Sequence, residues 1–159
     1  ATPDRESIII KDDDAVMEFQ RFTSSGGSAA VNFRASACTT IGQEGCVVAN
    51  GDQLGKFLFR GDDGTDTLSI GASIQALVDG TPGSNDMPGK IEFRTSSDGT
   101  TSNTVRVTIQ ADGSVNYAPM ATAPSSPSLG DVYVDSTSNE FCFYDGTSWT
   151  GLKAGGTCA

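Results

Sequence analysis

Apolar and polar residues alternate in four short runs between Gly51 and Tyr117. A spacing of two places side chains on one face of a β-strand. Asp-Gly pairs follow the runs, and glycine readily adopts the positive φ angles that tight hairpin turns require. The pattern therefore predicts an all-β fold, sandwich-like or fibre-like, of short antiparallel strands joined by Asp-Gly turns. The apolar positions are Phe57 and Phe59; Ile70, Ile74, Ala76 and Val78; Ile91 and Phe93; and Val105, Val107 and Ile109, and the Asp-Gly pairs begin at Asp63, Asp79, Asp98 and Asp112.

A further apolar segment precedes this region, and a strand is expected within residues 7–22. Three consecutive isoleucines open the segment, and the triple aspartate at 12–14 indicates a turn before a second apolar run. Such a strand stays within its own sheet by default, but it can also be donated to the exposed sheet edge of a neighbouring copy. The candidate assembly residues are Ile8, Ile9, Ile10, Val16 and Phe19.

Small residues dominate the next segment, where a strand is predicted over 30–36 with Val31 and Phe33 on one face. Small side chains suit the close approach of another backbone, as at the axis of a fibre. A return strand is expected to begin at Val47 and to end at Asn50-Gly51. The loop between these two strands is expected to project from the shaft.

The composition changes after residue 117. Residues 118–130 are rich in proline, alanine and serine, which is typical of an extended linker. The linker separates a predicted domain of residues 1–117 from a small C-terminal module of residues 131–159.

Alternating apolar residues and a second set of turn residues predict a three-stranded β-meander in this module. Its aromatic residues Tyr144 and Trp149 are expected to cover the small sheet, because so few strands are not stable bare. The alternative is a sugar-binding platform, since aromatic faces stack on sugar rings. The predicted strands are 131–134, 140–144 and 148–152.

The four cysteines fall into two local pairs, Cys38 with Cys46 and Cys142 with Cys158. Four cysteines allow three connectivities, and proximity in the sequence favours these two bonds. A zinc site is a poor alternative because the spacings are not C-x-x-C and the chain has no histidine. Four free thiols are the other alternative. Disulfides form in oxidising compartments, so the two pairs predict an extracellular protein.

The chain carries a formal net charge of −10 and no histidine. Nucleic-acid binding requires clustered lysine and arginine, which this sequence lacks, so no nucleic-acid partner is expected. No apolar stretch has the length that spans a membrane, so no membrane partner is expected either. The first three residues resemble the processed end that remains when a leader is removed. A serine nucleophile needs a base, usually histidine, and the sequence therefore predicts neither an enzyme nor a cofactor.

Two further motifs are interpreted as ordinary turns. The acidic segments at 12–14 and 61–66 could gather carboxylates around Ca²⁺, but neither has the ligand order of an EF-hand, and solvated acidic turns are expected instead. The tripeptide Arg60-Gly61-Asp62 is one that integrins bind, yet a strand end running into a Gly-Asp turn explains it better. The sequence therefore predicts no metal site.

Four segments resemble the repeated domain of bacteriophage tail-fibre proteins, a domain that also occurs in secreted bacterial proteins. They are GDQLGKFLFRGDDGTD, VDGTPG, MPGKIEFRTSSDGTTS and VRVTIQADGSV, and the resemblance covers residues 8–116. It implies an elongated, β-rich fibre that self-associates, often as a trimer, and that has no catalytic activity. The four cysteines depart from phage fibres, which assemble in a reducing cytoplasm, and favour a secreted fibre subunit over a virion protein.

Leucine, isoleucine, valine and phenylalanine together make up 32 of the 159 residues. One copy therefore has few residues with which to build a core, and we expect neighbouring copies to complete it. The alternative is a thin sandwich that is stable as a monomer. The expected function is a structural subunit of an extracellular fibre, either a homotrimer or a helical polymer. The rival function is an adhesin module that contacts a cell-surface glycan or protein.

Overall fold

The computed structural model describes Met17, Phe19, residues 29–40 and 42–153, Gly156 and Cys158. The chain divides into two units, Ala1–Phe33 and Arg34–Ala159, and every strand among the described residues lies in the second unit. The described residues contain strands and turns but no helix. The prediction of an all-β fold is thus confirmed.

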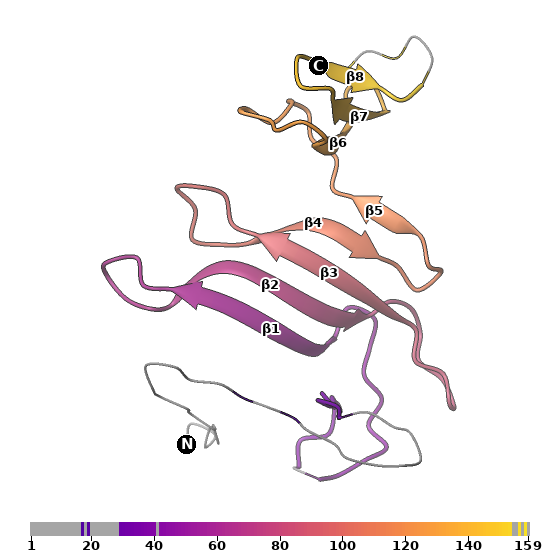
Figure 1. Cartoon of the computed structure of the whole chain (residues 1–159). Coiled ribbons are helices and arrows are strands. Elements are labelled where there is room, and N and C mark those ends of the chain that lie inside the picture. The colour runs from indigo at the N-terminus through magenta and orange to yellow at the C-terminus, as the bar shows by residue number, and fades with distance from the viewer. Residues whose placement is uncertain are drawn as a thin grey trace, which may run out of the picture. The chain divides into compact units, whose positions relative to one another are not determined.

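Five strands form one antiparallel sheet, in which each strand pairs with the next in sequence (Figure 1). We call it the large sheet. The four alternating runs become its first four strands, and a short fifth strand follows the turn at Asp112-Gly113. The strands are β1 (Gln53–Gly61), β2 (Ser69–Val78), β3 (Gly89–Thr95), β4 (Thr104–Ile109) and β5 (Val115–Tyr117).

The turn between β1 and β2 shows how the sequence reverses the chain. The Asp63 carboxylate accepts hydrogen bonds from the backbone N–H groups of Thr65 and Asp66, at 2.9 and 3.2 Å. The Ser69 hydroxyl donates a third hydrogen bond to it, at 2.7 Å. These bonds, with that from Ser69 the largest contribution, favour the ionised carboxylate and lower the pKa of Asp63 to about 2. Gly64 has a φ of 89°, in the left-handed region that glycine adopts without steric cost.

Two expected strands are absent. Residues 30–36 form no strand, and neither does the segment from Val47 to Gly51, so these two predictions are wrong. A strand forms only where a neighbouring backbone pairs with it. The backbone hydrogen bond from Ala37 N–H to the Cys46 carbonyl, at 3.1 Å, closes the disulfide loop without extending into a ladder.

The register between β3 and β4 corrects one assignment within the large sheet. The pairing shifts by one residue between Phe93, which lies opposite Val107, and Arg94, which lies opposite Val105. This β-bulge removes Val105 from the apolar row expected for its strand, because Arg94 alternates with Phe93. Val107 keeps its expected position.

The C-terminal module forms a second antiparallel sheet, in the order β6-β7-β8 (Figure 1). We call it the small sheet, and its strands are β6 (Val132–Asp135), β7 (Glu140–Tyr144) and β8 (Trp149–Gly151). The predicted C-terminal β-meander is therefore confirmed. The preceding proline-rich segment also contacts it, because Met120 forms an isolated parallel bridge with Asp135.

Buried apolar residues are few. Among the described residues, the buried hydrophobic ones are Val48, Val78, Tyr133 and Cys142, whereas eighteen large hydrophobic side chains are exposed. Two of the four buried residues, Tyr133 and Cys142, belong to the small sheet. The large sheet, with its five strands, therefore contributes one strand residue, Val78, to this core.

Candidate assembly surface

The registers of the large sheet align apolar side chains across all five strands. The central row consists of Phe57, Ile74, Phe93, Val107 and Tyr117, in order from β1 to β5. Residues directly opposite one another in a sheet share a face and contact their neighbours. This row is therefore a continuous apolar stripe across the sheet.

Two more rows lie on the same face, because positions two residues apart along a strand point to the same side. We call the three rows together the apolar face. The second row consists of Gly55, Ala76, Ile91, Ile109 and Val115, and the third of Phe59, Ala72, Thr95 and Thr104.

Most large side chains of the apolar face are exposed over a third to a half of their surface. Phe59 is 55 % exposed, Val115 52 %, Ile91 42 % and Phe93 39 %. Single exposed apolar residues are common on proteins, but a contiguous patch of them marks a site of interaction. The alternation in the sequence predicted these strands, but it did not predict that the apolar side would be the exposed one.

The opposite face carries a polar network that joins β1, β2 and β3. Gln53 Nε2 donates to Gln75 Oε1 at 2.8 Å, and Gln75 Nε2 donates to Glu92 Oε2 at 2.9 Å. Arg94 donates to the same Glu92 oxygen from Nε at 2.9 Å and from a terminal nitrogen at 2.7 Å. Lys90 Nζ lies 3.4 Å from Glu92 Oε1. We call this side of the sheet the polar face.

Glu92 is the centre of this network, and it is only 6 % exposed. Burial raises the pKa of its carboxyl group, but the hydrogen bonds from Gln75 and Arg94 and the charge of Arg94 lower it by more. The pKa of Glu92 therefore lies below its ordinary value, and the group is ionised near neutral pH. The buried charge is paired and hydrogen-bonded within one copy, so the polar face needs no further partner.

The disulfide between Cys38 and Cys46 closes the loop that the sequence predicted, with a Cα–Cα distance of 5.0 Å. A pocket of about 610 Å³ lies beside it and is lined by residues 34–36 and 42–46. Its lining combines one cation, Arg34, and one anion, Glu44, with small and polar residues. This mixture does not indicate any one class of ligand.

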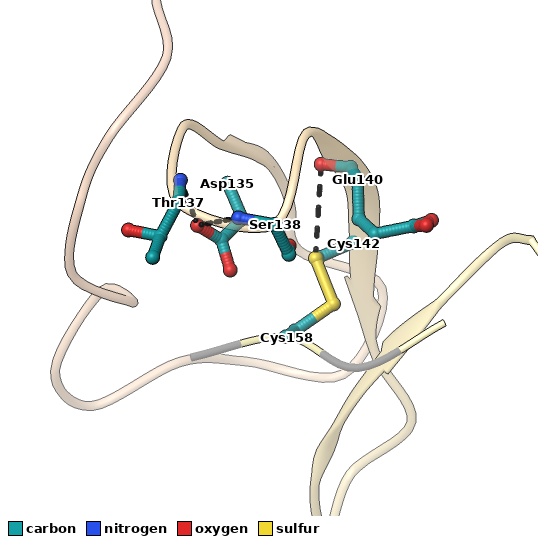
Figure 2. Close-up of a disulfide and its surroundings, with 6 residues drawn as sticks. All are labelled: Asp135, Thr137, Ser138, Glu140, Cys142 and Cys158. Carbon is teal, nitrogen blue, oxygen red and sulfur yellow. Dashed lines mark hydrogen bonds between the residues drawn. A yellow bond between two sulfur atoms is a disulfide. The ribbon is translucent and has the colours of Figure 1, made fainter. Parts of the chain in front are cut away.

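The second disulfide joins Cys158 to the small sheet (Figure 2). Cys142 of β7 is fully buried and is bonded to Cys158. Beside it, the buried Asp135 carboxylate accepts hydrogen bonds from the backbone N–H groups of Thr137 and Ser138, at 2.7 and 3.3 Å. A sheet of three short strands has little apolar surface of its own, and the crosslink offsets this shortage.

Trp149 packs against two tyrosines of the small sheet. Its ring centroid lies 4.7 Å from that of Tyr133, nearly edge to face at 79°, and 5.4 Å from that of Tyr144. Tyr133 is 3 % exposed, and burial, followed by the charge of Asp135, raises the pKa of its hydroxyl group. These contacts agree with the covering role for Tyr144 and Trp149, and the sugar-binding alternative stays a prediction.

The N-terminal candidate residues fall almost entirely outside the described part of the chain. Ile8, Ile9, Ile10 and Val16 are not among the described residues. Phe19 is described, and it is 52 % exposed. Donation of a strand within residues 7–22 to a neighbouring copy therefore stays a prediction.

The acidic turn at 61–66 uses its carboxylates for local hydrogen bonds. Asp62 accepts one from the Gly64 N–H at 2.8 Å, and Asp66 accepts one from the Leu68 N–H at 2.7 Å. In the described ranges, no three His, Cys, Asp or Glu side chains are grouped so that they could hold a metal ion. The same ranges contain no helix with the length and apolar character needed to cross a membrane.

Comparison with known proteins adds no identification. No protein-family model matches the chain, and no curated protein sequence matches it either. The function is therefore inferred from the residues and the geometry described above.

Proposed function

We propose that this chain is a structural subunit of an extracellular fibre that assembles from copies of itself. The observation that supports this best is the imbalance between four buried hydrophobic residues and eighteen exposed large ones among the described residues. Leaving apolar surface in water costs about 25 cal/mol per Å² relative to burying it. Copies that complete one another's cores remove this surface from water, so association stabilises each of them.

Three further observations agree with this function. The disulfides Cys38–Cys46 and Cys142–Cys158 suit an oxidising compartment outside the cytoplasm. The resemblance to tail-fibre repeat domains suggests a homotrimer, and an open helical polymer is the other stoichiometry that fits. The net charge of −10 keeps the subunits soluble and discourages unspecific contacts away from the assembly surface.

Sedimentation and thermal melting of the non-reduced protein over a wide concentration range test this function. We expect the average mass to rise with concentration, and the melting temperature to rise with it, because association stabilises only the folded state. A plateau at three times the 16.4 kDa chain mass would indicate a trimer, and continued growth with filaments in electron micrographs would indicate a polymer. A species of one chain mass with the same melting temperature at every concentration would refute the proposal.

A further inference from the structure

We infer that the copies meet through the apolar face of the large sheet, which each copy turns towards the same face of its neighbours around the common axis of the fibre. This inference rests on the proposed function and names its contact surface. Two other modes of self-association are possible, namely edge-to-edge pairing along β1 and donation of a strand from residues 7–22. Neither of them covers the exposed rows of the apolar face.

The charge distribution favours a second copy as the occupant of this surface. No described strand position in the three rows of the apolar face is charged, although the chain has a net charge of −10. One cation reaches the edge of the face, since Arg106 Nε donates a hydrogen bond to the Thr95 hydroxyl at 2.9 Å. Like charges opposed across a contact hinder association, and here Lys90, Glu92 and Arg94 lie on the other side of the sheet. A strongly charged partner would leave its own charges unpaired against this face. An anionic membrane surface would repel the acidic chain.

The size of the apolar face also fits a protein–protein contact. Seven exposed large side chains of the three rows together present on the order of 600 Å² of surface. A standard interface buries about 800 Å² on each partner, so this face supplies most of one. The seven side chains are Phe59, Ile74, Ile91, Phe93, Ile109, Val115 and Tyr117, of which Tyr117 also packs nearly edge to face against Phe141 of β7 within one copy, with ring centroids 5.5 Å apart.

The relief of the face suits packing against another sheet. Ala72 and Ala76 flank Ile74 along β2, and larger side chains lie opposite them, with Phe59 beside Ala72 and Ile91 beside Ala76. Sheets that pack face to face lie about 10 Å apart, with side chains of one layer entering spaces in the other. The alanine positions provide such spaces next to larger side chains. Two identical faces can therefore interlock at the density of a protein interior.

A matched pair of lysine substitutions on β4 tests this contact. Ile109 lies in the second row of the apolar face, and its neighbour Thr108 lies on the polar face, opposite Glu92. We expect Ile109→Lys to raise the dissociation constant for self-association about 100-fold, because each contact would bury an unpaired charge. Thr108→Lys should leave the constant within about twofold of the unchanged chain, because its charge lies on the polar face, away from the contact. Sedimentation gives the constants, and circular dichroism verifies that both variants retain the sheet.

A second measurement, on the unaltered protein, does not depend on the folding of a variant. Hydroxyl-radical footprinting across the association range should protect Phe59 and Phe93 as copies associate, while Met87, which is 53 % exposed outside the strands, keeps its reactivity. Two results would overturn the inference and leave the proposed function standing: an Ile109→Lys variant that folds and associates like the unchanged chain, or association without protection of Phe59 and Phe93. A chain that never associates would instead defeat the proposed function itself.

Discussion

The small sheet buries its central residues within one copy, whereas most large side chains on the apolar face of the large sheet are 36–55 % exposed. In the small sheet, Tyr133 is 3 % exposed and packs against Trp149, and Cys142 is fully buried and bonded to Cys158. In the large sheet, the described strands carry no cysteine, and Phe93 at the centre of the apolar face is 39 % exposed. The sheet with fewer strands therefore buries its central side chains more fully within one copy.

This difference shows that the number of strands does not decide whether a sheet is self-sufficient. A single layer has two faces, and each must be polar or covered. In the small sheet, Trp149 packs against Tyr133 and Tyr144, and the buried Cys142 is bonded to Cys158. The large sheet satisfies only its polar face, through the network around Glu92. Substitutions in the small sheet should therefore change the stability of a single copy, and substitutions on the apolar face should change the association between copies.

The largest expected effect comes from removing the disulfide of the small sheet. Replacing Cys142 and Cys158 together by serine should lower the free energy of unfolding of this sheet by about 3 kcal/mol, the value for a closed loop of this size. Trp149 is the single tryptophan of the chain and lies in β8, so its fluorescence reports on this sheet. Denaturant titration followed by that fluorescence gives the change.

The other disulfide provides the matched control for that experiment. Replacing Cys38 and Cys46 by serine should leave the tryptophan transition unchanged, because this bond closes a separate loop. Equal shifts for both double variants would mean that the crosslinks act on the whole chain, and the contrast between the two sheets would then be lost.

The aromatic cover of the small sheet should have the next largest effect. Trp149→Ala removes the ring that packs against Tyr133 and Tyr144, and we expect a loss of about 2–3 kcal/mol, at or below the lower end for a buried tryptophan. Hydrogen exchange of the β6 and β7 amides measures the loss without the need for tryptophan. Unchanged protection, together with lost binding on a glycan array, would favour the rival adhesin function.

Much of this fold could be predicted from the sequence, because alternation and Asp-Gly turns are local signals. They predicted β1 to β4 and the meander of the small sheet. They did not predict the β-bulges that place Val105 opposite Arg94 and Ile70 opposite Arg60, because register depends on pairing between strands. Strands were wrongly expected at 30–36 and at Val47, since apolar content alone does not supply a pairing partner.

The candidate surface was less predictable than the fold. Period-two alternation shows that one face is apolar, but it cannot show whether that face is covered. The polar signal was present in the sequence, since Gln75, Glu92 and Arg94 occupy the alternate positions of their strands. Only the register shows that these residues meet in one network and that the apolar rows continue across all five strands.

A smaller effect is expected from a pair of neighbours on β3 that point to opposite faces. In a dilute sample, Glu92→Ala should lower the free energy of unfolding by about 1–2 kcal/mol, because Gln75 and Arg94 lose a charged partner that is shielded from solvent. In the same dilute sample, Ile91→Thr should lower the free energy of unfolding by only about 0.5 kcal/mol, since the position is 42 % exposed and threonine keeps the β-branch. In concentrated samples, Ile91→Thr should weaken association and Glu92→Ala should not. Chemical unfolding and sedimentation of both variants give the two quantities.

The smallest expected effect concerns two turns that use the same device, one in each sheet. The Asp145 carboxylate accepts hydrogen bonds from the backbone N–H groups of Ser148 and Thr147, both at 2.8 Å, and from the Thr147 hydroxyl. These bonds, with that from the Ser148 backbone the largest contribution, lower the pKa of Asp145 to about 2, as the pKa of Asp63 is lowered in the large sheet. A carboxyl group whose pKa is lower in the folded state stabilises the fold above its unfolded pKa, near 4, and loses that contribution as the pH falls towards 2.

Stability should therefore decline between about pH 4 and pH 2, and the decline should be shallower in variants that cannot ionise. With Asp145→Asn, the Trp149 transition should lose part of its dependence on pH in this window, because the small sheet holds that turn. With Asp63→Asn, the same transition should keep its full dependence, while the change appears in the circular dichroism of the large sheet. Urea midpoints at several pH values measure both. If Asp63→Asn altered the Trp149 transition as much as Asp145→Asn does, the two sheets would unfold as one cooperative unit, and the contrast between them would be one of burial and not of independent stability.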